Sequence, residues 1–233
     1  MSVVLRRASE RGRTRIDWLD SRHTFSFGEY HDARHMGFGT LRVINDDRVE
    51  PGQGFATHGH RDMEIITYVL EGALEHRDSL GSGSVITPGE VQIMSAGTGI
   101  THSEFNHSHV EPVHFLQTWV VPAERGVAPR YAQRAFDPAE LQGRLRVVVA
   151  PGAPDGALDI HQDARLLVGR LAAGDEVVHR QGAGRRAWLH VARGTVALGG
   201  TPLDAGDGAA VTGEPAITVR ASGPAEILVF DVA

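Results

Sequence analysis

The sequence predicts an all-β protein made of two β domains in one chain, and three observations support this fold class. Short β-prone runs alternate with turns along the chain, and its 28 glycines and 11 prolines suit many tight turns. No long stretch carries helical periodicity. The second half repeats the order of strands and turns of the first. With 41% hydrophobic residues, the 233-residue chain can form substantial cores.

Composition and charge exclude several functional classes. There is no cysteine, which excludes disulfides and thiolate-ligated zinc or iron–sulfur sites. A net charge of −6 argues against electrostatic binding to nucleic acid. Residues 6–15 carry five arginines, which we interpret as a solvated face because Glu10 and Asp17 are interspersed. We find no signal-peptide pattern and no apolar run of membrane-spanning length, so we expect a cytoplasmic protein with no membrane contact.

In the first half, β-prone runs and turn residues predict the strands in order. The Asn45-Asp46-Asp47 cluster and Pro88-Gly89 indicate turns between them. Residues 16–20 and 23–27 read as short strands or turn segments. The remaining strands are expected at 40–45, 65–70, 74–78, 85–87, 91–94 and 113–121.

Two polar clusters interrupt these apolar runs and carry the chemistry. His58 and His60 lie two residues apart, as do His102 and Glu104. Residues two apart on a strand point to the same face, so each pair would project together. If the two strands face each other, three imidazoles and one carboxylate converge on a metal site of nitrogen and oxygen ligands.

The distribution of histidine agrees with a metal centre in the first half. Ten of the 13 histidines precede residue 125. We interpret His23, His31 and His35 as surface or hydrogen-bonded residues, because none has a second ligand type at strand spacing.

Two motifs resemble those of the cupin superfamily. Gly52, His58, His60 and Glu64 have the order of the first cupin motif, and His102 with Asn106 resembles the end of the second. Two departures, seven residues between Glu64 and Gly72 and a longer 95–102 segment, match one subfamily. The chain resembles the pirins, in their shorter bacterial form. The segments that carry this resemblance are 23–27, 42–45, 58–64, 68–72, 92–99 and 102–104.

The resemblance implies a ligand set and a metal. It assigns His58, His60, His102 and Glu104 as ligands and implies that Glu64 does not bind the metal. One divalent transition metal per chain is expected. The resemblance favours Fe²⁺, and manganese, nickel, copper and zinc remain alternatives, since three imidazoles and one carboxylate suit them all.

The second half predicts a barrel that lacks these ligands. Residues 188–198 align with 66–76, which places Arg180 and Gly182 where the first half has its histidine pair, and Val219 where it has His102. Further strands are expected at 145–150, 166–171, 187–192, 195–198, 216–219 and 227–231. Between the halves, Asp137, Pro138 and Glu140 predict a short helix to about residue 142.

These observations together predict a bicupin, two jelly-roll-like β-barrels in tandem. The expected divisions are a metal-binding domain at 1–125, a linker with a short helix at 126–143, and a metal-free cupin domain at 144–233.

Three functional hypotheses follow from the resemblance. The first is a quercetin 2,3-dioxygenase-like oxidoreductase, in which a flavonol and O₂ react at the metal with release of carbon monoxide. Glu104 would then also be the catalytic base, and Phe38, Phe55 and Met94 are candidate pocket walls. The second is a metal-dependent, redox-sensing regulator that binds a transcription factor or a metabolic enzyme. The third is a cupin isomerase or other small-molecule enzyme with the same ligands.

Overall fold

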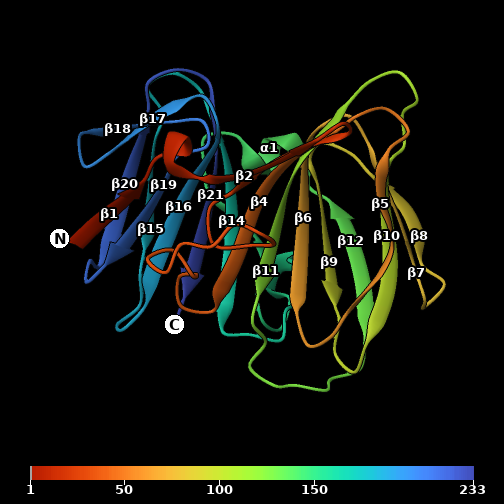
Figure 1. Ribbon diagram of the computed structural model, residues 1–233. Coiled ribbons are helices and arrows are strands. Elements are labelled where there is room, and N and C mark those ends of the chain that lie inside the picture. The colour runs from red at the N-terminus through yellow and green to blue at the C-terminus, as the bar shows by residue number, and fades with distance from the viewer. Residues whose placement is uncertain (1) are drawn as a thin grey trace.

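Four antiparallel β-sheets make up the computed structural model, which describes residues 2–233 (Figure 1). In the first half, a seven-stranded sheet of order β12-β9-β6-β11-β4-β3-β2 is joined by a four-stranded sheet of order β5-β10-β7-β8. In the second half, a six-stranded sheet of order β1-β19-β16-β21-β14-β13 is joined by a four-stranded sheet of order β15-β20-β17-β18. The predicted all-β bicupin fold is confirmed.

The elements of the first half are short and follow one another closely. They are β1 (Ser2–Arg6), a 3₁₀ turn (Ala8–Glu10), β2 (Gly12–Ile16), β3 (Leu19–His23), β4 (Leu41–Val49), β5 (Gly54–His60), β6 (Glu64–Glu71), β7 (Leu74–Asp78), β8 (Gly83–Ile86), β9 (Glu90–Ser95), β10 (Ile100–Asn106), β11 (Val113–Val120) and β12 (Arg130–Ala135).

The second half begins with the one α-helix of residues 2–233. Its elements are α1 (Pro138–Leu141), β13 (Arg146–Val149), a 3₁₀ turn (Pro154–Gly156), β14 (Ala164–Leu171), β15 (Glu176–Arg180), β16 (Arg186–Arg193), β17 (Thr195–Leu198), β18 (Thr201–Asp204), β19 (Gly208–Thr212), β20 (Ala216–Ala221) and β21 (Ala225–Val232). The predicted helix start is confirmed, because Asp137 accepts a hydrogen bond from the Ala139 amide and Pro138 follows it.

The two halves repeat one topology, as the sequence alignment predicted. The order β5-β10-β7-β8 corresponds strand for strand to β15-β20-β17-β18, and β9-β6-β11-β4 corresponds to β19-β16-β21-β14. The interior of the second barrel is apolar where the first carries its polar clusters, since Val177, Val196, Ile217 and Val219 all lie in its core. Hydrophobic burial therefore stabilises the second barrel at these positions.

The two large sheets pack against each other, so the centre of the seven-stranded sheet is buried on both faces. Ile66 and Tyr68 of β6 belong to the core shared with Trp188 and Phe230 of the second half. Their neighbour Ile65 belongs to a different cluster, inside the first barrel. This alternation explains why β6 is an almost continuous hydrophobic run in sequence.

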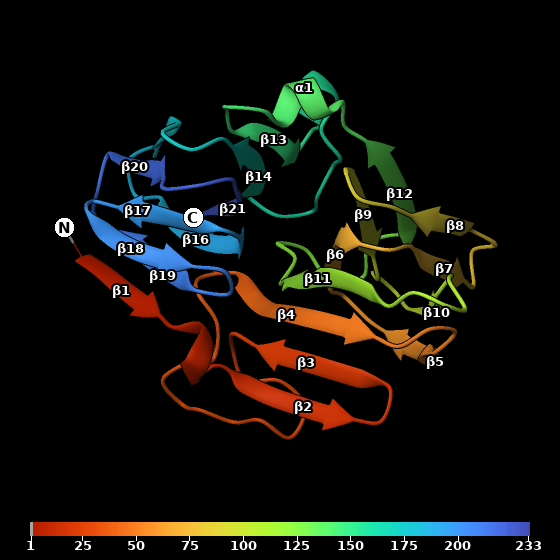
Figure 2. The same cartoon turned by 90° about the horizontal axis from the view of Figure 1, so that it is seen from above.

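The edges of both large sheets are covered by strands that the sequence did not predict. β1 leaves the first half and pairs with β19, Ser2 to Arg6 opposite Thr212 to Gly208 (Figure 2). β12 pairs with β9, so the expected linker at 126–143 contains a strand and is corrected accordingly. β12 mixes polar and apolar residues without clear alternation, and β1 is a five-residue segment whose three apolar residues are consecutive. Pairing covers open sheet edges, which would otherwise expose unpaired backbone groups.

Two further expectations are corrected by burial. The predicted turn at Asn45-Asp46-Asp47 lies inside β4, because all three side chains are buried in polar contacts. The arginine-rich start is only partly a solvated face. Arg6 is buried and donates to the Thr24 carbonyl at 3.1 Å. Arg11 pairs with Asp46 at 3.1 Å, with only 6% of its side chain exposed.

Across residues 2–233, no helix has the length and apolar character needed to cross a membrane.

Candidate metal centre and its cavity

Strands β5 and β10 bring the two predicted polar pairs together. The strands are antiparallel neighbours, and His102 lies directly opposite His58 while Ile100 lies opposite His60. Because side chains alternate along each strand, His58, His60 and His102 share one face. The imidazole centroids of these three residues are 4.5 to 4.9 Å apart, which places them at the corners of a nearly regular triangle.

Hydrogen bonds orient two of the three imidazoles and leave their other nitrogen free. His58 donates from Nδ1 to the Ala56 carbonyl at 2.8 Å, so its Nε2 carries a lone pair. His102 Nδ1 lies 3.4 Å from His76 Nδ1, and His76 Nε2 lies 3.0 Å from the Asp78 carboxylate. The Asp78 carboxylate accepts a hydrogen bond from His76 Nε2, which leaves the lone pair of the His76 imidazole on Nδ1. His76 Nδ1 therefore accepts a hydrogen bond from His102 Nδ1. This chain leaves His102 Nε2 as a buried atom with no partner.

His60 and His102 are held in the neutral form that binds metals. Burial and the nearby His58 lower the pKa of His60 to about 4. Burial, followed by the neighbouring histidines, lowers the pKa of His102 to about 3. A neutral imidazole can give a lone pair to a divalent ion, whereas an imidazolium cannot.

Glu104 reaches the site through a bulge in β10. The register shifts between His102 and Glu104, so that Glu104 pairs with Phe55. Gly54 permits this close approach, because a Cβ atom there would lie 2.2 Å from the Glu104 carbonyl oxygen. The Glu104 carboxylate groups with His102 and His76 within 4.8 Å, while His58, His60 and His102 form a separate triple. His102 belongs to both groups.

Burial dominates the electrostatics of Glu104. It raises the pKa of this carboxyl to about 7, while hydrogen bonds from Gln117, Thr67 and Gln92 act in the opposite direction. Gln117 Nε2 donates to Glu104 Oε2 at 2.7 Å. The second oxygen, Oε1, is buried with no partner. Two unpartnered buried atoms, Glu104 Oε1 and His102 Nε2, are costly unless a ligand satisfies them.

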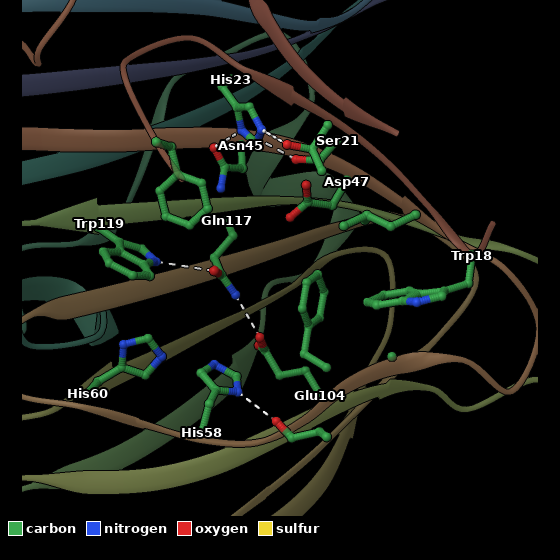
Figure 3. Close-up of a pocket in the computed structure, with 16 residues that line it drawn as sticks. Trp18, Ser21, His23, Asn45, Asp47, His58, His60, Glu104, Gln117 and Trp119 are labelled. Carbon is green, nitrogen blue, oxygen red and sulfur yellow. Dashed lines mark hydrogen bonds between the residues drawn. The ribbon is translucent and has the colours of Figure 1, made fainter. Parts of the chain in front are cut away.

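A cavity of about 510 Å³ opens onto this site. Figure 3 shows His58, His60 and Glu104 at one side of it and His23, Asn45, Ser21 and Asp47 at the opposite side. The aromatic residues that line the space between are Trp18, Phe27, Phe55 and Trp119. The volume falls in the range of about 300–1,000 Å³ typical of small-molecule sites.

One of the three predicted pocket walls lines this cavity. Phe55 does, with its ring 5.2 Å from that of Trp18 in an edge-to-face contact. Phe38 lies at the contact between the two halves, where its ring is 5.6 Å from Trp188. Met94 is fully buried in a cluster with Ile65 and Ile100 and has no surface on the cavity. Met94 is a core residue and Phe38 is partly buried against the core. Neither lines the cavity, and the expectation for both is corrected.

The other acidic and histidine candidates lie apart from the triangle. Glu64 turns to the outer side of its sheet, where it accepts from Ser95 at 2.9 Å and from the His161 amide at 3.2 Å. His23 is buried and hydrogen-bonded to Thr14 and Asn45. In the second half, His179 pairs with Asp231 at 2.7 Å. Within residues 2–233, both groups with metal-ligand geometry fall in the first half.

Sequence reasoning missed the residues that hold these ligands in place. His76 and Asp78 lie behind His102, and the Tyr131 ring stacks on His76 at 4.6 Å between centroids. Gln117 lies beside Glu104 on the neighbouring sheet. For Gln117 the available signal was a polar side chain between the apolar residues of β11, whereas β7 is mostly polar and His76 could be found only because it shares a face with the apolar Leu74.

Family comparisons agree with this geometry along nearly the whole chain. Residues 4–120 match the pirin family model, and residues 147–232 match the model described as quercetinase C-terminal cupin domain. The chain belongs to the pirin family. The resemblance predicted from the sequence is confirmed.

Individual pirin relatives cover the full length. The chain is 50% identical to a protein of Escherichia coli K12 named quercetin 2,3-dioxygenase, over 99% of this chain and 98% of the relative. The crystal structure of YhhW from E. coli has a TM-score of 0.96 at 48% identity, covering 100% of this chain and 98% of that one. A structure of the bacterial pirin YhhW in complex with nickel(II) has a TM-score of 0.94 at 49% identity, covering 99% of each chain. These names support the expectation of an oxidoreductase related to quercetin 2,3-dioxygenase.

Proposed function

We propose that this pirin is a metal-dependent dioxygenase that opens the ring of flavonols such as quercetin with O₂ and releases carbon monoxide. The observation that carries the proposal is the set of inward-facing donors at one side of an aromatic-walled cavity. Three imidazoles and a buried carboxylate would supply the ligands, and the cavity supplies space for a flat aromatic molecule. The curated name of the E. coli relative supports the same reaction.

The residues fit a divalent transition metal. His102 Nε2 and Glu104 Oε1 are buried and unpartnered, and nitrogen and oxygen donors of this kind suit such an ion. We infer that His58, His60, His102 and Glu104 would hold it. The bound metal would supply the redox chemistry that joins O₂ and the flavonol.

The identity of the metal is a separate proposal. The resemblance favours iron, while a relative has been crystallised with nickel(II). Manganese, copper and zinc have compatible ligand preferences, because affinity order and metal supply decide occupancy at such sites.

In the proposed reaction, Glu104 takes the proton of the flavonol hydroxyl group that lies beside the ring carbonyl. Its unpartnered Oε1 is available for that proton, and Gln117 holds the other oxygen in place. Both atoms of O₂ then enter the ester product. Two carbon–carbon bonds break, and the carbon between them leaves as carbon monoxide together with the hydroxyl oxygen.

The aromatic walls would orient the substrate. Trp119 meets the His60 ring edge-to-face at 5.0 Å, and Phe27 meets Trp119 at 5.3 Å in the same manner. These rings offer flat apolar surfaces beside the donors. Stacking on them would hold the flavonol and exclude water from the reacting carbon.

Aerobic turnover with quercetin tests the proposal. The protein is stripped of metal, reloaded with one of Fe²⁺, Mn²⁺, Ni²⁺ or Cu²⁺, and assayed for carbon monoxide and oxygen uptake. We expect one carbon monoxide per quercetin consumed. If no metal form turns over any flavonol, the redox-sensing regulator becomes the better hypothesis, and carbon-monoxide-free conversion would indicate another small-molecule enzyme. The cytoplasmic location and the boundaries at residues 125 and 144 stay predictions.

A further inference from the structure

We propose that Asp47 and Asn45 form a second polar subsite in this cavity, which binds a phenolic hydroxyl group at the end of the flavonol furthest from the candidate metal ligands. The inference rests on the dioxygenase function proposed above and specifies how its substrate is recognised.

Strand β4 presents both side chains to the cavity. Asn45 and Asp47 lie two residues apart and therefore share a face. Asp47 pairs with Ser21 and Asn45 with His23 on one neighbouring strand, and Asn45 pairs with Gln117 on the other. Figure 3 shows the two residues on the opposite side of the cavity from His58 and His60.

The orientation of Asn45 is set by His23. The Asn45 Oδ1 atom lies 2.8 Å from His23 Nδ1, and His23 Nε2 lies 2.8 Å from the Thr14 hydroxyl. Since an amide oxygen only accepts, His23 donates from Nδ1 and accepts from Thr14 at Nε2. This arrangement turns the Asn45 amide nitrogen toward the cavity as a hydrogen-bond donor (Figure 3).

Asp47 has an unsatisfied carboxyl oxygen. The residue is 3% exposed and lines the cavity, yet its Oδ1 atom is buried without a hydrogen-bond partner. A buried carboxyl group in this state destabilises the fold unless a ligand satisfies it. Burial raises the pKa of Asp47 to about 7. Either protonation state can bind a phenolic hydroxyl, because the carboxylate accepts and the carboxylic acid both accepts and donates.

The shape of a flavonol matches this layout. Its skeleton is flat and rigid, and it carries hydroxyl groups both at the reacting end and on its outer rings. The cavity has polar groups on two opposite sides with aromatic walls between them. A hydroxyl on the fused ring or one on the aryl substituent would satisfy the subsite by the same chemistry.

Anaerobic binding to the metal-loaded protein tests the inference separately from turnover. Dissociation constants are measured for quercetin, for galangin, which lacks the aryl hydroxyls, and for 3,3′,4′-trihydroxyflavone, which lacks the fused-ring hydroxyls. We expect the wild type to bind one of these analogues about 3- to 30-fold more weakly than quercetin, and that analogue identifies the ring. In Asp47→Ala the ratio of that analogue's dissociation constant to the dissociation constant of quercetin should fall close to one. Asp47→Asn, which keeps the shape and one acceptor, should retain part of the wild-type difference.

A wall variant supplies the matched control. Phe55→Leu should weaken all three ligands by a similar factor, because it removes stacking surface and no hydrogen bond. In steady-state assays, Asp47→Ala should raise KM for quercetin far more than it lowers kcat, since the subsite is remote from the reacting carbon.

The outcomes separate the two proposals. If the ratio of the analogue's dissociation constant to that of quercetin is the same in wild type and Asp47→Ala, the proposed subsite is overturned. The proposed dioxygenase function is not affected by that result. If wild type binds quercetin more tightly than one analogue, Asp47→Ala loses this difference, and no carbon monoxide is released in turnover, the subsite is supported and the dioxygenase function is overturned. A metal-loaded wild type that binds no flavonol overturns both.

Discussion

Gln117 donates its side-chain amide to Glu104 at 2.7 Å and accepts from Trp119 Nε1 at 3.1 Å. The indole has only a donor, so it determines which end of the Gln117 amide faces Glu104. The NH₂ group therefore always meets the carboxylate, and Glu104 Oε1 stays free for a metal or a proton.

Replacing Gln117 with Leu should lower turnover per bound metal. The change removes the hydrogen bond that orients the Glu104 carboxylate, an interaction worth about 1.5–3 kcal/mol. We expect turnover per bound metal to fall about 10- to 100-fold. Trp119→Phe is the comparison variant, since it keeps an aromatic side chain and loses the indole N–H together with the five-membered ring. Because the Gln117 amide remains beside Glu104, its effect on turnover per bound metal should be smaller. Unchanged turnover per metal in Gln117→Leu would show that this contact has no functional role.

Glu104→Gln should separate metal binding from proton transfer. Because Gln117 presents a donor, the new amide must turn its oxygen toward Gln117 and its NH₂ group toward the former position of Oε1. An NH₂ group neither binds a cation nor accepts a proton. Metal content should fall, and activity per remaining metal should fall about 10²–10⁴-fold, the usual contribution of a positioned base. Normal activity per bound metal would eliminate the base role.

Metal analysis should give one equivalent per chain. His58→Ala and His60→Ala each remove a candidate ligand, so metal content should drop steeply while the β-sheet circular dichroism persists. His179→Ala is the matched control in the second half, where the imidazole pairs with Asp231 and not with other histidines. A second equivalent that survives dialysis and is lost in His179→Ala would refute the empty second barrel.

His76→Phe should weaken metal binding although His76 is not a proposed ligand. It breaks the chain from Asp78 through His76 to His102, which orients His102 Nε2. Loss of such an outer partner typically costs about 10- to 100-fold in metal affinity. Competition with a chelator measures the affinity. Tyr131→Phe should change it much less, because the ring that stacks on His76 is kept. If His76→Phe retains wild-type affinity, His102 is oriented by packing alone.

His190 should make the protein less stable at acid pH. It is fully buried with both nitrogens unpartnered, near Arg11, Asp46 and Asp207, and burial lowers its pKa to about 4. Its pKa in the unfolded chain is about 6.5. As the pH falls from about 6.5 to about 4, the unfolded state binds a proton that the folded state does not. The free energy of unfolding should then decrease, by on the order of 3 kcal/mol from this residue.

The comparison with His190→Leu isolates this contribution. Leucine has a similar size and cannot be protonated, so the variant should lose less stability over that pH range. The candidate metal ligands are present in both proteins. Their contribution therefore cancels when the free energies of unfolding, measured with urea at each pH, are subtracted from one another. Identical pH dependence in the two proteins would mean that His190 is paired or hydrated.

The strands that sequence predicted best are those with strong local signals. Residues 74–78 and 195–198 were predicted with their observed bounds, because β-prone runs end at clear turns. β1 and β12 were missed, since neither short segment has a period-two pattern and both are held by pairing with β19 and β9. The Asn45-Asp46-Asp47 stretch reads locally as a turn, yet tertiary contacts keep it in β4.

The candidate metal ligands could be predicted because strand periodicity is local. The two residues of each pair lie two apart on one strand, so they share a face of that strand whatever residues surround them. The cavity could not be predicted in this way. Phe55 lines it, whereas Phe38 and Met94 are equally apolar and lie in cores, and only the packing of whole sheets distinguishes these positions.

The sequence by itself determined the β class, the repeat of two barrels, the pirin resemblance and the polar pairs in the first barrel. These properties depend on residue type and spacing over short stretches. Only the tertiary structure decided that Gln117 orients Glu104, that His76 and Asp78 lie behind His102, and that Asp47 faces the candidate metal ligands across a cavity. Those contacts join strands far apart in the chain, and their geometry follows from sheet register and packing, which no local pattern encodes.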